Sequence, residues 1–206
     1  MIVAIPKEKT AREARVAATP ETVKVLIKSG LKVQVETQAG NQSFFSDQDY
    51  VEAGAQIVNS SNELLSFADI VIKVLPPSLE ETSQLKIGSV VISFFQSTRE
   101  ISKVKALAER SITGFSMHLI PRTTLAQKMD ALSSQSNIAG YKSVIMGANH
   151  LSIYMPLLMT AAGTIKPAKV LILGAGVAGL QAIATAKRLG AQVEAFDVRA
   201  EVKEQV

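Results

Sequence analysis

One glycine-rich segment, Gly174 to Gly179, constrains the fold of this chain more than any other feature of its sequence. It reads GAGVAG and follows an apolar run, Lys169 to Leu173, that is typical of a buried strand. A helical pattern then covers Leu180 to Leu189, and a second strand-like run, Gln192 to Phe196, ends at Asp197. This order predicts a strand, a tight turn, a helix and a parallel second strand.

The three glycines of the segment have separate physical roles. Gly174 permits the tight turn, Gly176 lets the backbone approach a pyrophosphate, and Gly179 allows close packing of the helix against the strand. The helix N-terminus adds unpaired N–H groups and the positive end of its dipole, which both favour a phosphate. Asp197 follows at about 20 residues, where a carboxylate accepts the hydroxyls of the adenosine ribose. The segment therefore predicts a dinucleotide-binding unit.

The acidic residue at the strand end also distinguishes between two dinucleotides. A carboxylate there repels a 2′-phosphate, so Asp197 favours NAD(H) over NADP(H). Arg199 lies close by, and an arginine near this position can instead bind a 2′-phosphate. Because Asp197 holds the strand-end position, we predict NAD(H) as the cofactor of this chain.

The part of the chain before about residue 120 alternates short β-branched runs with helical segments, which is typical of a parallel α/β sheet. We predict strands at residues 1–5, 31–37, 56–58, 70–75, 89–95 and 112–119, with helices at residues 20–29, 46–54, 79–85 and 99–110 and a further helix that opens at Ser60. Together with the glycine-rich segment, this pattern predicts an α/β protein with two Rossmann-like, doubly wound parallel-sheet domains.

The predicted domain boundaries follow from changes in periodicity. We expect an N-terminal α/β domain over residues 1–132, a connecting helix over 133–166, and the start of an NAD-binding Rossmann domain over 167–206. One apolar stripe of that helix is formed by Ile138, Tyr141, Ile145, Ala148 and Leu151. Only Val198 to Val206 follow the acidic residue, so we expect the second domain to be truncated.

Composition excludes several kinds of site and partner. The chain has no cysteine, which excludes a disulfide-linked partner, and its two histidines, His118 and His150, cannot build a multi-histidine metal site. Twenty-two Lys and Arg against 18 Asp and Glu are spread without a basic block, so we expect no nucleic-acid partner. The longest apolar run, Leu151 to Ile165, is shorter than the roughly 20 residues of a membrane-spanning helix.

Three segments of the chain, residues 5–30, 121–145 and 166–199, together resemble one known family. They are similar to the NAD(H)-binding components of proton-translocating NAD(P) transhydrogenases, which are relatives of alanine dehydrogenase. The first segment is shared by both kinds of protein, whereas the loop PRTTLAQKMD is similar to the transhydrogenase side. The resemblance implies an enzyme that transfers hydride from NADH to NADP⁺.

The resemblance also implies the residues of the site. Arg122, Gln127, Asp130 and Ser133 would lie against the nicotinamide and its ribose as the catalytic group. The implied cofactor-binding set is Arg122, Thr123, Thr124, Gln127, Gly174, Gly176, Val177, Gly179, Asp197, Val198 and Arg199. Hydride transfer between two nicotinamides needs no acid or base, because it depends on holding the two rings together and excluding water.

Partners and location are further implications of the resemblance. NADP(H) would be bound by a partner component, and separate membrane-spanning components would couple hydride transfer to proton movement. The chain would form a homodimer and lie in the cytoplasm, peripheral on the inner face of the membrane through its partner subunits.

Two alternative functions stay open on the sequence. In alanine dehydrogenase the substrate pocket resembles Arg15 and Lys73 of this chain and also requires a histidine, but Gln96 stands in the matching segment. Glutamine cannot act as the general acid or base that this reaction needs. Lys73 lies inside an apolar strand and is therefore expected to have a partner. The other alternative is a non-catalytic NAD-binding module.

Overall fold

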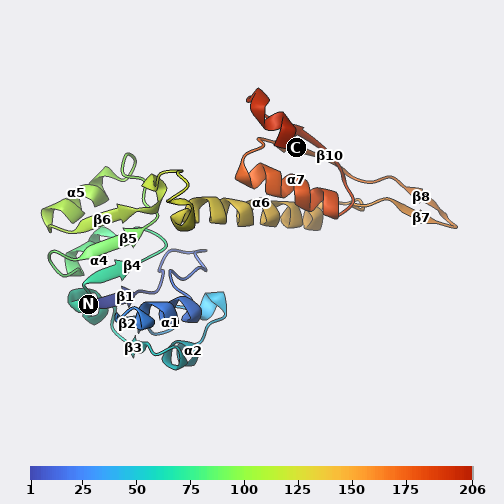
Figure 1. Ribbon diagram of the computed structural model, residues 1–206. Helices are drawn as coiled ribbons and strands as arrows, with labels where there is room; N and C mark the ends of the chain where they lie inside the picture. The colour runs from blue at the N-terminus through green and yellow to red at the C-terminus, as the bar shows by residue number, and fades with distance from the viewer. Residues whose placement is uncertain (206) are drawn as a thin grey trace. The chain divides into compact units, whose positions relative to one another are not determined.

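A computed structural model describes residues 1–205 of the chain. The chain divides into two compact units, Met1–Pro121 and a second unit that begins at Arg122. Both are α/β structures (Figure 1), and each is described by itself below.

The first unit is built on a six-stranded parallel sheet with the order β3-β2-β1-β4-β5-β6. This is the doubly wound order, in which the direction of winding reverses between β1 and β4. The strands are β1 (Ile2–Ile5), β2 (Lys32–Glu36), β3 (Gln56–Val58), β4 (Ile70–Ile72), β5 (Val90–Ser93) and β6 (Thr113–Ser116). All six lie within the predicted runs, and the α/β prediction is confirmed.

Five α-helices connect these strands, and most begin at a side chain that satisfies their first N–H groups. Thr19, Ser46, Ser60 and Ser78 each accept a hydrogen bond from a backbone N–H in the first turn of the helix that follows. The helices are α1 (Pro20–Lys28), α2 (Asp47–Glu52), α3 (Ser61–Phe67), α4 (Leu79–Gln84) and α5 (Ile101–Glu109), with short 3₁₀ turns η1 (Asn41–Ser43) and η2 (Met117–Leu119).

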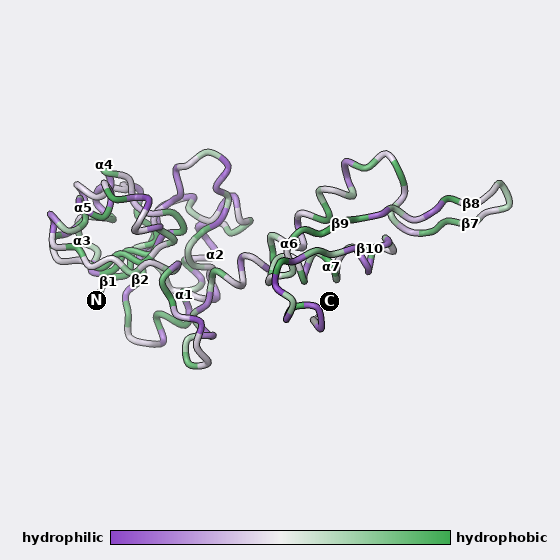
Figure 2. Tube along the Cα trace, turned by 90° about the horizontal axis from the view of Figure 1, so that it is seen from above, coloured by the Kyte–Doolittle hydropathy of each residue, from purple (hydrophilic) through white to green (hydrophobic). Residues whose placement is uncertain are grey.

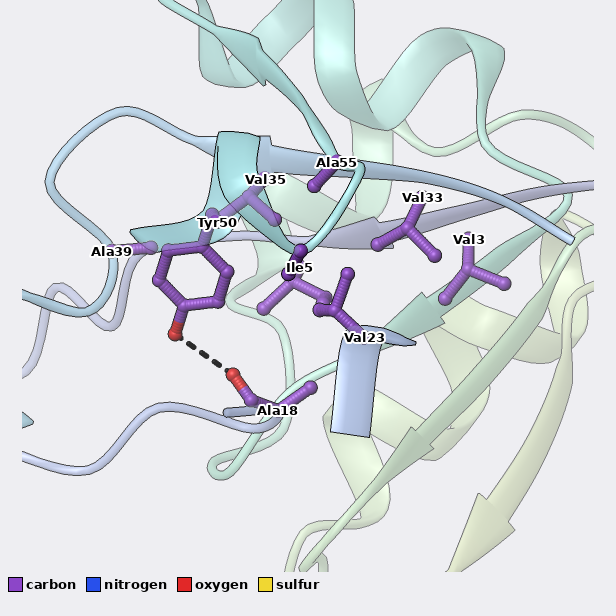
Figure 3. Close-up of a cluster of buried hydrophobic side chains, with 10 residues drawn as sticks. Val3, Ile5, Ala18, Val23, Val33, Val35, Ala39, Tyr50 and Ala55 are labelled. Carbon is purple, nitrogen blue, oxygen red and sulfur yellow. Dashed lines mark hydrogen bonds between the residues drawn. The ribbon is translucent and has the colours of Figure 1, made fainter. Parts of the chain in front are cut away.

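Both faces of the first sheet are buried. On one face Val3, Ile5 and Val35 pack with Val23 of α1 and Tyr50 of α2, and the Tyr50 hydroxyl donates to the Ala18 carbonyl at 2.8 Å (Figure 3). A second cluster on the other face joins Ala4, Val71 and Val91 to leucines of α3 and α5. Burial on both faces explains why the strands read as nearly continuous apolar runs.

The second unit contains two long helices, a parallel strand pair and a hairpin. Its elements are η3 (Gln127–Met129), α6 (Ala131–His150), β7 (Leu158–Thr160), β8 (Gly163–Ile165), β9 (Lys169–Leu173), α7 (Val177–Arg188), β10 (Gln192–Phe196) and η4 (Ala200–Gln205). Strands β9 and β10 are parallel and in register from Lys169 with Gln192 to Leu173 with Phe196. Figure 2 shows β9 as a largely hydrophobic segment. The predicted strand–turn–helix–strand order is confirmed.

The helix expected over residues 133–166 is shorter in the structure. It ends at His150, and the residues after Leu151 lead into the antiparallel β7–β8 hairpin. Pro156 cannot continue a helix because it lacks an N–H, and Gly163 takes φ of 139° at the hairpin turn. The first compact unit ends at Pro121, so the residues from Arg122 to Leu132 lie in the second unit.

Small residues, rather than the predicted stripe, form the buried face of α6. Gly140 and Val144 are buried, whereas Ile138 is 56% and Tyr141 is 51% exposed. A Cβ on Gly140 would lie 2.1 Å from the carbonyl oxygen of Ala178 in α7. The two helices therefore approach so closely that a large side chain cannot stand between them, and of the predicted stripe only Ala148 packs against the core of this unit.

Candidate functional site

The glycine turn between β9 and α7 has the geometry that its sequence predicts. Gly174 takes φ of 97°, a conformation that other residues rarely adopt. A Cβ on Gly179 would lie 1.7 Å from the Gly174 carbonyl oxygen, so only glycine fits there. In contrast, a Cβ on Gly176 would meet nothing within 4 Å. The turn thus packs tightly against its own backbone at Gly179, and it leaves free space for a ligand at Gly176.

The open side of the turn lies at the N-terminus of α7. Gly176 is the N-cap of this helix, and among residues 1–205 it offers no side-chain cap to the first turn. The first N–H groups of a helix have no partner inside the helix, and the helix dipole makes this end attractive to an anion. The geometry fits a pyrophosphate, in agreement with the sequence pattern.

Asp197 lies directly after β10 and accepts a hydrogen bond from the glycine turn. Its Oδ2 accepts the backbone N–H of Ala175 at 2.7 Å, which ties the ends of the two strands together. Arg199 donates three more hydrogen bonds to this carboxylate. Its backbone N–H and its Nε bond to Oδ1, at 2.9 and 3.0 Å, and its Nη2 bonds to Oδ2 at 3.0 Å. The Arg199 guanidinium holds the pKa of Asp197 far below its ordinary value, with help from the two backbone N–H groups.

A hollow of about 420 Å³ lies beside this carboxylate. It is lined by Ala175 of the turn, by Phe196, Asp197 and Arg199 at the end of β10, and by residues of η4. Two valines flank the site, with Val177 41% and Val198 89% exposed. The combination of apolar surface, an acceptor for hydroxyls and an anion-binding turn fits the adenosine half of a dinucleotide.

The loop that carries the expected catalytic group lies before α6. The Thr123 carbonyl accepts the N–H groups of Ala126 and Gln127, and it thereby shapes the turn that leads into η3. Arg122, Thr123, Thr124 and Gln127 are all exposed. Their side chains are therefore available to a ligand.

Asp130 and Ser133 bond to one another at the start of α6. Asp130 is the N-cap, and its carboxylate accepts the Ser133 N–H at 2.9 Å and the Ser133 hydroxyl at 2.6 Å. These bonds lower the pKa of Asp130, and the positive charge of Arg122 lowers it further. The structure thus gives Asp130 a capping role that the sequence analysis did not consider, and it brings Arg122, Asp130 and Ser133 together.

The packing of α6 on α7 relates the loop to the glycine turn. Gly140 lies against Ala178, and the Asn137 side chain donates to Gln181 at 3.1 Å. Helix α6 begins about nine residues before Gly140, which is about 14 Å of helix. It extends past the start of α7 (Figure 1), so the loop lies at the same end of the helix pair as the glycine turn. Among the hydrogen bonds and ion pairs of residues 1–205, none joins the loop before α6 to the glycine turn or to Asp197.

In the first unit, the ends of β1 and β4 hold a buried group of charges that we call the ion cluster, formed by Glu8, Lys73 and Glu81. Lys73 Nζ donates to both carboxylate oxygens of Glu81, at 2.9 and 3.0 Å, and lies 3.9 Å from Glu8 Oε2. Glu8 Oε1 accepts the Val74 N–H at 2.6 Å. The expectation that Lys73 has a partner is confirmed.

The ion cluster stands where an α/β sheet of this order commonly binds a ligand, at the reversal of winding. Burial raises the pKa of Glu8, although the charge of Lys73 opposes this effect. Nearby, Arg15 bonds to Glu13 through Nε at 2.8 Å and Nη2 at 2.7 Å. The cations of this region are thus held by the chain's own carboxylates.

Besides the cap formed by Asp130, sequence reasoning missed two of these contacts. Ser78 and Glu81 form a capping box at the start of α4, and this spacing could have placed Glu81. The bonds of Arg199 to Asp197 have no comparable signal, since a separation of two residues does not fix where a long side chain lies.

Neither histidine stands in a group suited to catalysis. His118 lies in η2 with its ring edge-on to Phe94 at 5.6 Å, and His150 is the exposed last residue of α6. Over residues 1–205 no group of three or more His, Asp or Glu side chains could hold a metal ion. None of the helices in that range has the length and apolar character to cross a membrane.

Comparison with known proteins gives two matching family models. The model described as alanine dehydrogenase/PNT, N-terminal domain, matches residues 4–139, and that of the C-terminal domain matches residues 143–206. The chain is 49% identical to a Rhodospirillum rubrum protein named as the first part of NAD(P) transhydrogenase subunit alpha, over 100% of this chain and 55% of that protein.

Similarity extends to a solved structure and to a second kind of enzyme. A crystal structure of transhydrogenase from Sinorhizobium meliloti matches with a TM-score of 0.97 and 47% identity, over 100% of this chain and 61% of that chain. Alanine dehydrogenase of Staphylococcus saprophyticus is 36% identical over 96% of this chain and 53% of that enzyme. The chain spans about half the length of these curated relatives.

Proposed function

Because this chain belongs to the alanine dehydrogenase/PNT family, we propose that it binds NAD(H) in its second unit and forms the NAD(H) side of a transhydrogenase. The observation that carries the proposal is the open glycine turn at the start of α7, tied to Asp197 through the N–H of Ala175. The higher identity to transhydrogenase than to alanine dehydrogenase supports the choice of reaction.

The residues of the second unit would divide the work of binding. The turn at Gly176 and the N-terminus of α7 would hold the pyrophosphate, and Asp197 would accept the hydroxyls of the adenosine ribose. Val177 and Val198 would offer apolar contact to the adenosine half. Gly174 and Gly179 would act indirectly, because they allow the turn to close.

The loop before α6 would orient the reacting end. The bound nicotinamide supplies the hydride chemistry, and the chain supplies position. Arg122 would bond to the carboxamide, Thr123 and Thr124 would line the site, and Gln127 would bond to the ribose. Asp130 and Ser133, which already bond to one another, would fix the start of α6 and thus the direction of the loop. Hydride transfer is sensitive to small displacements of the two rings.

We place the chain in an assembly with an NADP(H)-binding component and membrane-spanning components. The name of the Rhodospirillum relative, which refers to one portion of a subunit alpha, supports the existence of further subunits. We also propose a homodimer, located in the cytoplasm at the inner face of the membrane through these partners. Analytical ultracentrifugation and membrane co-sedimentation with and without the partners test these two statements.

The proposal is tested by assaying the protein together with its partner components for NADH-driven reduction of an NADP⁺ analogue. We expect Arg122→Ala to lower the rate about 100-fold, because the nicotinamide loses its fixed position. Gln127→Asn should also lower it, whereas Lys128→Ala, in the same exposed loop, should leave it unchanged. A rate that survives Arg122→Ala would contradict the assigned role of the loop.

A parallel assay with pyruvate, ammonia and NADH distinguishes alanine dehydrogenase. Gln96 stands in the segment where that enzyme needs a histidine, and Lys73 is held by Glu81 and Glu8. We expect no turnover of pyruvate. Activity in this assay alone would replace the proposed function, and NADH binding without either activity would favour a non-catalytic module.

A further inference from the structure

The carboxylate of Asp197 has its hydrogen-bonding capacity filled by donors of this chain. An ionised carboxylate offers about four acceptor positions. Four N–H groups bond to Asp197, two on each oxygen, from Ala175 and Arg199. A ribose hydroxyl can therefore bond to this carboxylate only if one of these donors leaves.

The four donors differ in how easily they can leave. Two are backbone N–H groups, one in the glycine turn and one in the chain directly after β10, and both are fixed by the fold. The other two are Nε and Nη2 of the Arg199 guanidinium. The Arg199 side chain is 50% exposed, whereas that of Asp197 is only 8% exposed. The half-exposed guanidinium can rotate into solvent, whereas the two backbone donors cannot leave without a change in the fold.

We propose that Arg199 and the adenosine ribose of NAD(H) compete for the same acceptor positions on Asp197, and that Arg199 thereby reduces the preference for NAD(H) over NADP(H). The inference rests on the proposed function, in which Asp197 accepts the ribose hydroxyls. It adds that the guanidinium is displaced when NAD(H) binds and that it stays near the ribose, beside the hollow that Asp197 and Arg199 both line.

The displaced guanidinium has a second effect on selectivity. A 2′-phosphate is repelled by Asp197, but a guanidinium released next to the ribose offsets some of this repulsion because it can pair with phosphate. Arg199 therefore weakens binding of NAD(H) and assists binding of NADP(H). The net result is less discrimination than Asp197 alone would give.

The test measures NADH and NADPH affinities of the full 206-residue chain by saturation-transfer NMR, which detects weak binding. We expect Arg199→Ala to bind NADH about two- to fivefold more tightly, since the competing ion pair is gone. The same variant should bind NADPH more weakly. Arg199→Lys, which keeps the charge but loses the two-pronged donor, should lie between wild type and Arg199→Ala for both nucleotides. Unchanged or weaker NADH binding by Arg199→Ala would overturn the inference.

A second measurement follows the displacement directly in the wild-type chain. The ¹⁵N-labelled Nε–H signal of Arg199 should shift and exchange faster with water as NADH is added, and a signal that stays unchanged at saturation would also overturn the inference. Asp197→Asn separates this result from the proposed function. If Asp197→Asn does not weaken NADH binding, the ribose contact itself is wrong; if it does and Arg199→Ala has no effect, only the inference on Arg199 fails.

Discussion

The two units use the same strand-and-helix plan but treat the ends of their strands differently. In the first unit, the reversal of winding between β1 and β4 is filled by the ion cluster of Glu8, Lys73 and Glu81, whose side chains are almost fully buried. In the second unit, the ends of β9 and β10 carry a glycine turn that is open at Gly176 and an exposed arginine on Asp197.

The difference shows what a charged pair indicates about function. Lys73 and its two carboxylates cannot move apart without leaving a charge in a buried place, so they close their site and fix the fold. Asp197 and Arg199 can separate because the guanidinium reaches solvent. A ligand can therefore replace one partner of the exposed pair but neither partner of the buried cluster.

The largest effect is expected from removing the cation of the ion cluster. Lys73→Met leaves Glu8 buried without its cation and leaves Glu81 with only the exposed Lys9 at 3.9 Å, which should destabilise the first unit by ~3–5 kcal/mol. Urea unfolding followed by the amide signals of β1 and β4 measures the change. Lys86→Met, which breaks an ion pair with Asp69 whose lysine side chain is 48% exposed, is the control and should change stability little. Equal effects of both variants would remove the distinction between closed and open pairs.

A second prediction concerns the helix pair that supports the open site. Gly140→Ala should destabilise the second unit by ~1–3 kcal/mol, because its Cβ would lie 2.1 Å from the Ala178 carbonyl oxygen. Gly147→Ala, in the same helix, meets nothing within 4 Å and should stabilise by ~0.5–1 kcal/mol. Hydrogen exchange of the α7 amides reports both changes. If Gly140→Ala leaves the stability of the second unit unchanged, α6 and α7 are not held in the close contact seen between Gly140 and Ala178.

The ribose acceptor gives the next effect in size. Asp197→Asn should weaken NADH binding about tenfold or more, because the hydroxyls lose a charged acceptor. Glu194→Gln, an exposed substitution in β10, the strand directly before Asp197, should leave affinity unchanged. Titration by NMR compares the two. Similar losses in both variants would indicate a general effect of charge instead of a specific contact.

The smallest effect is the response of Glu8 to pH. Burial raises its folded pKa above the ordinary value of 4.5, so folding favours the protonated form. This contribution to stability is present below the unfolded pKa and is lost as the pH rises through the folded pKa. Glu8→Gln should therefore give a small gain in stability at pH 7 that vanishes on acidification, while Glu109→Gln at the surface should not. Thermal unfolding of both variants at several pH values checks this difference.

Most of the sheet and helix pattern could be predicted because each element carries a local signal. The β-branched runs, the serine and threonine caps and the glycine turn all lie in short stretches of sequence. The same local rules predict the site residues from Gly174 to Asp197. Because β9 and β10 are parallel and in register, the glycine turn and Asp197 follow their strands at the same edge of the sheet.

Features that depend on distant packing could not be predicted in the same way. The buried face of α6 is chosen by its close approach to α7, which selects Gly140 over the larger Ile138 and Tyr141. The β7–β8 hairpin is short and exposed, so it lacks a buried apolar face with the alternating pattern of a strand, although Pro156 and Gly163 were local signals that the helix ends before it. The bonds between Arg199 and Asp197 depend on the rotamer of a long side chain.

The central claim, that the open strand ends of the second unit bind NAD(H) while the closed ends of the first do not, is tested most directly by mapping amide shifts as NADH is added. We predict that the largest shifts fall on Gly176, Val177 and Val198, with no change at Glu8 and Lys73. Shifts that gather at Glu8 and Lys73 and leave the glycine turn unchanged would contradict it.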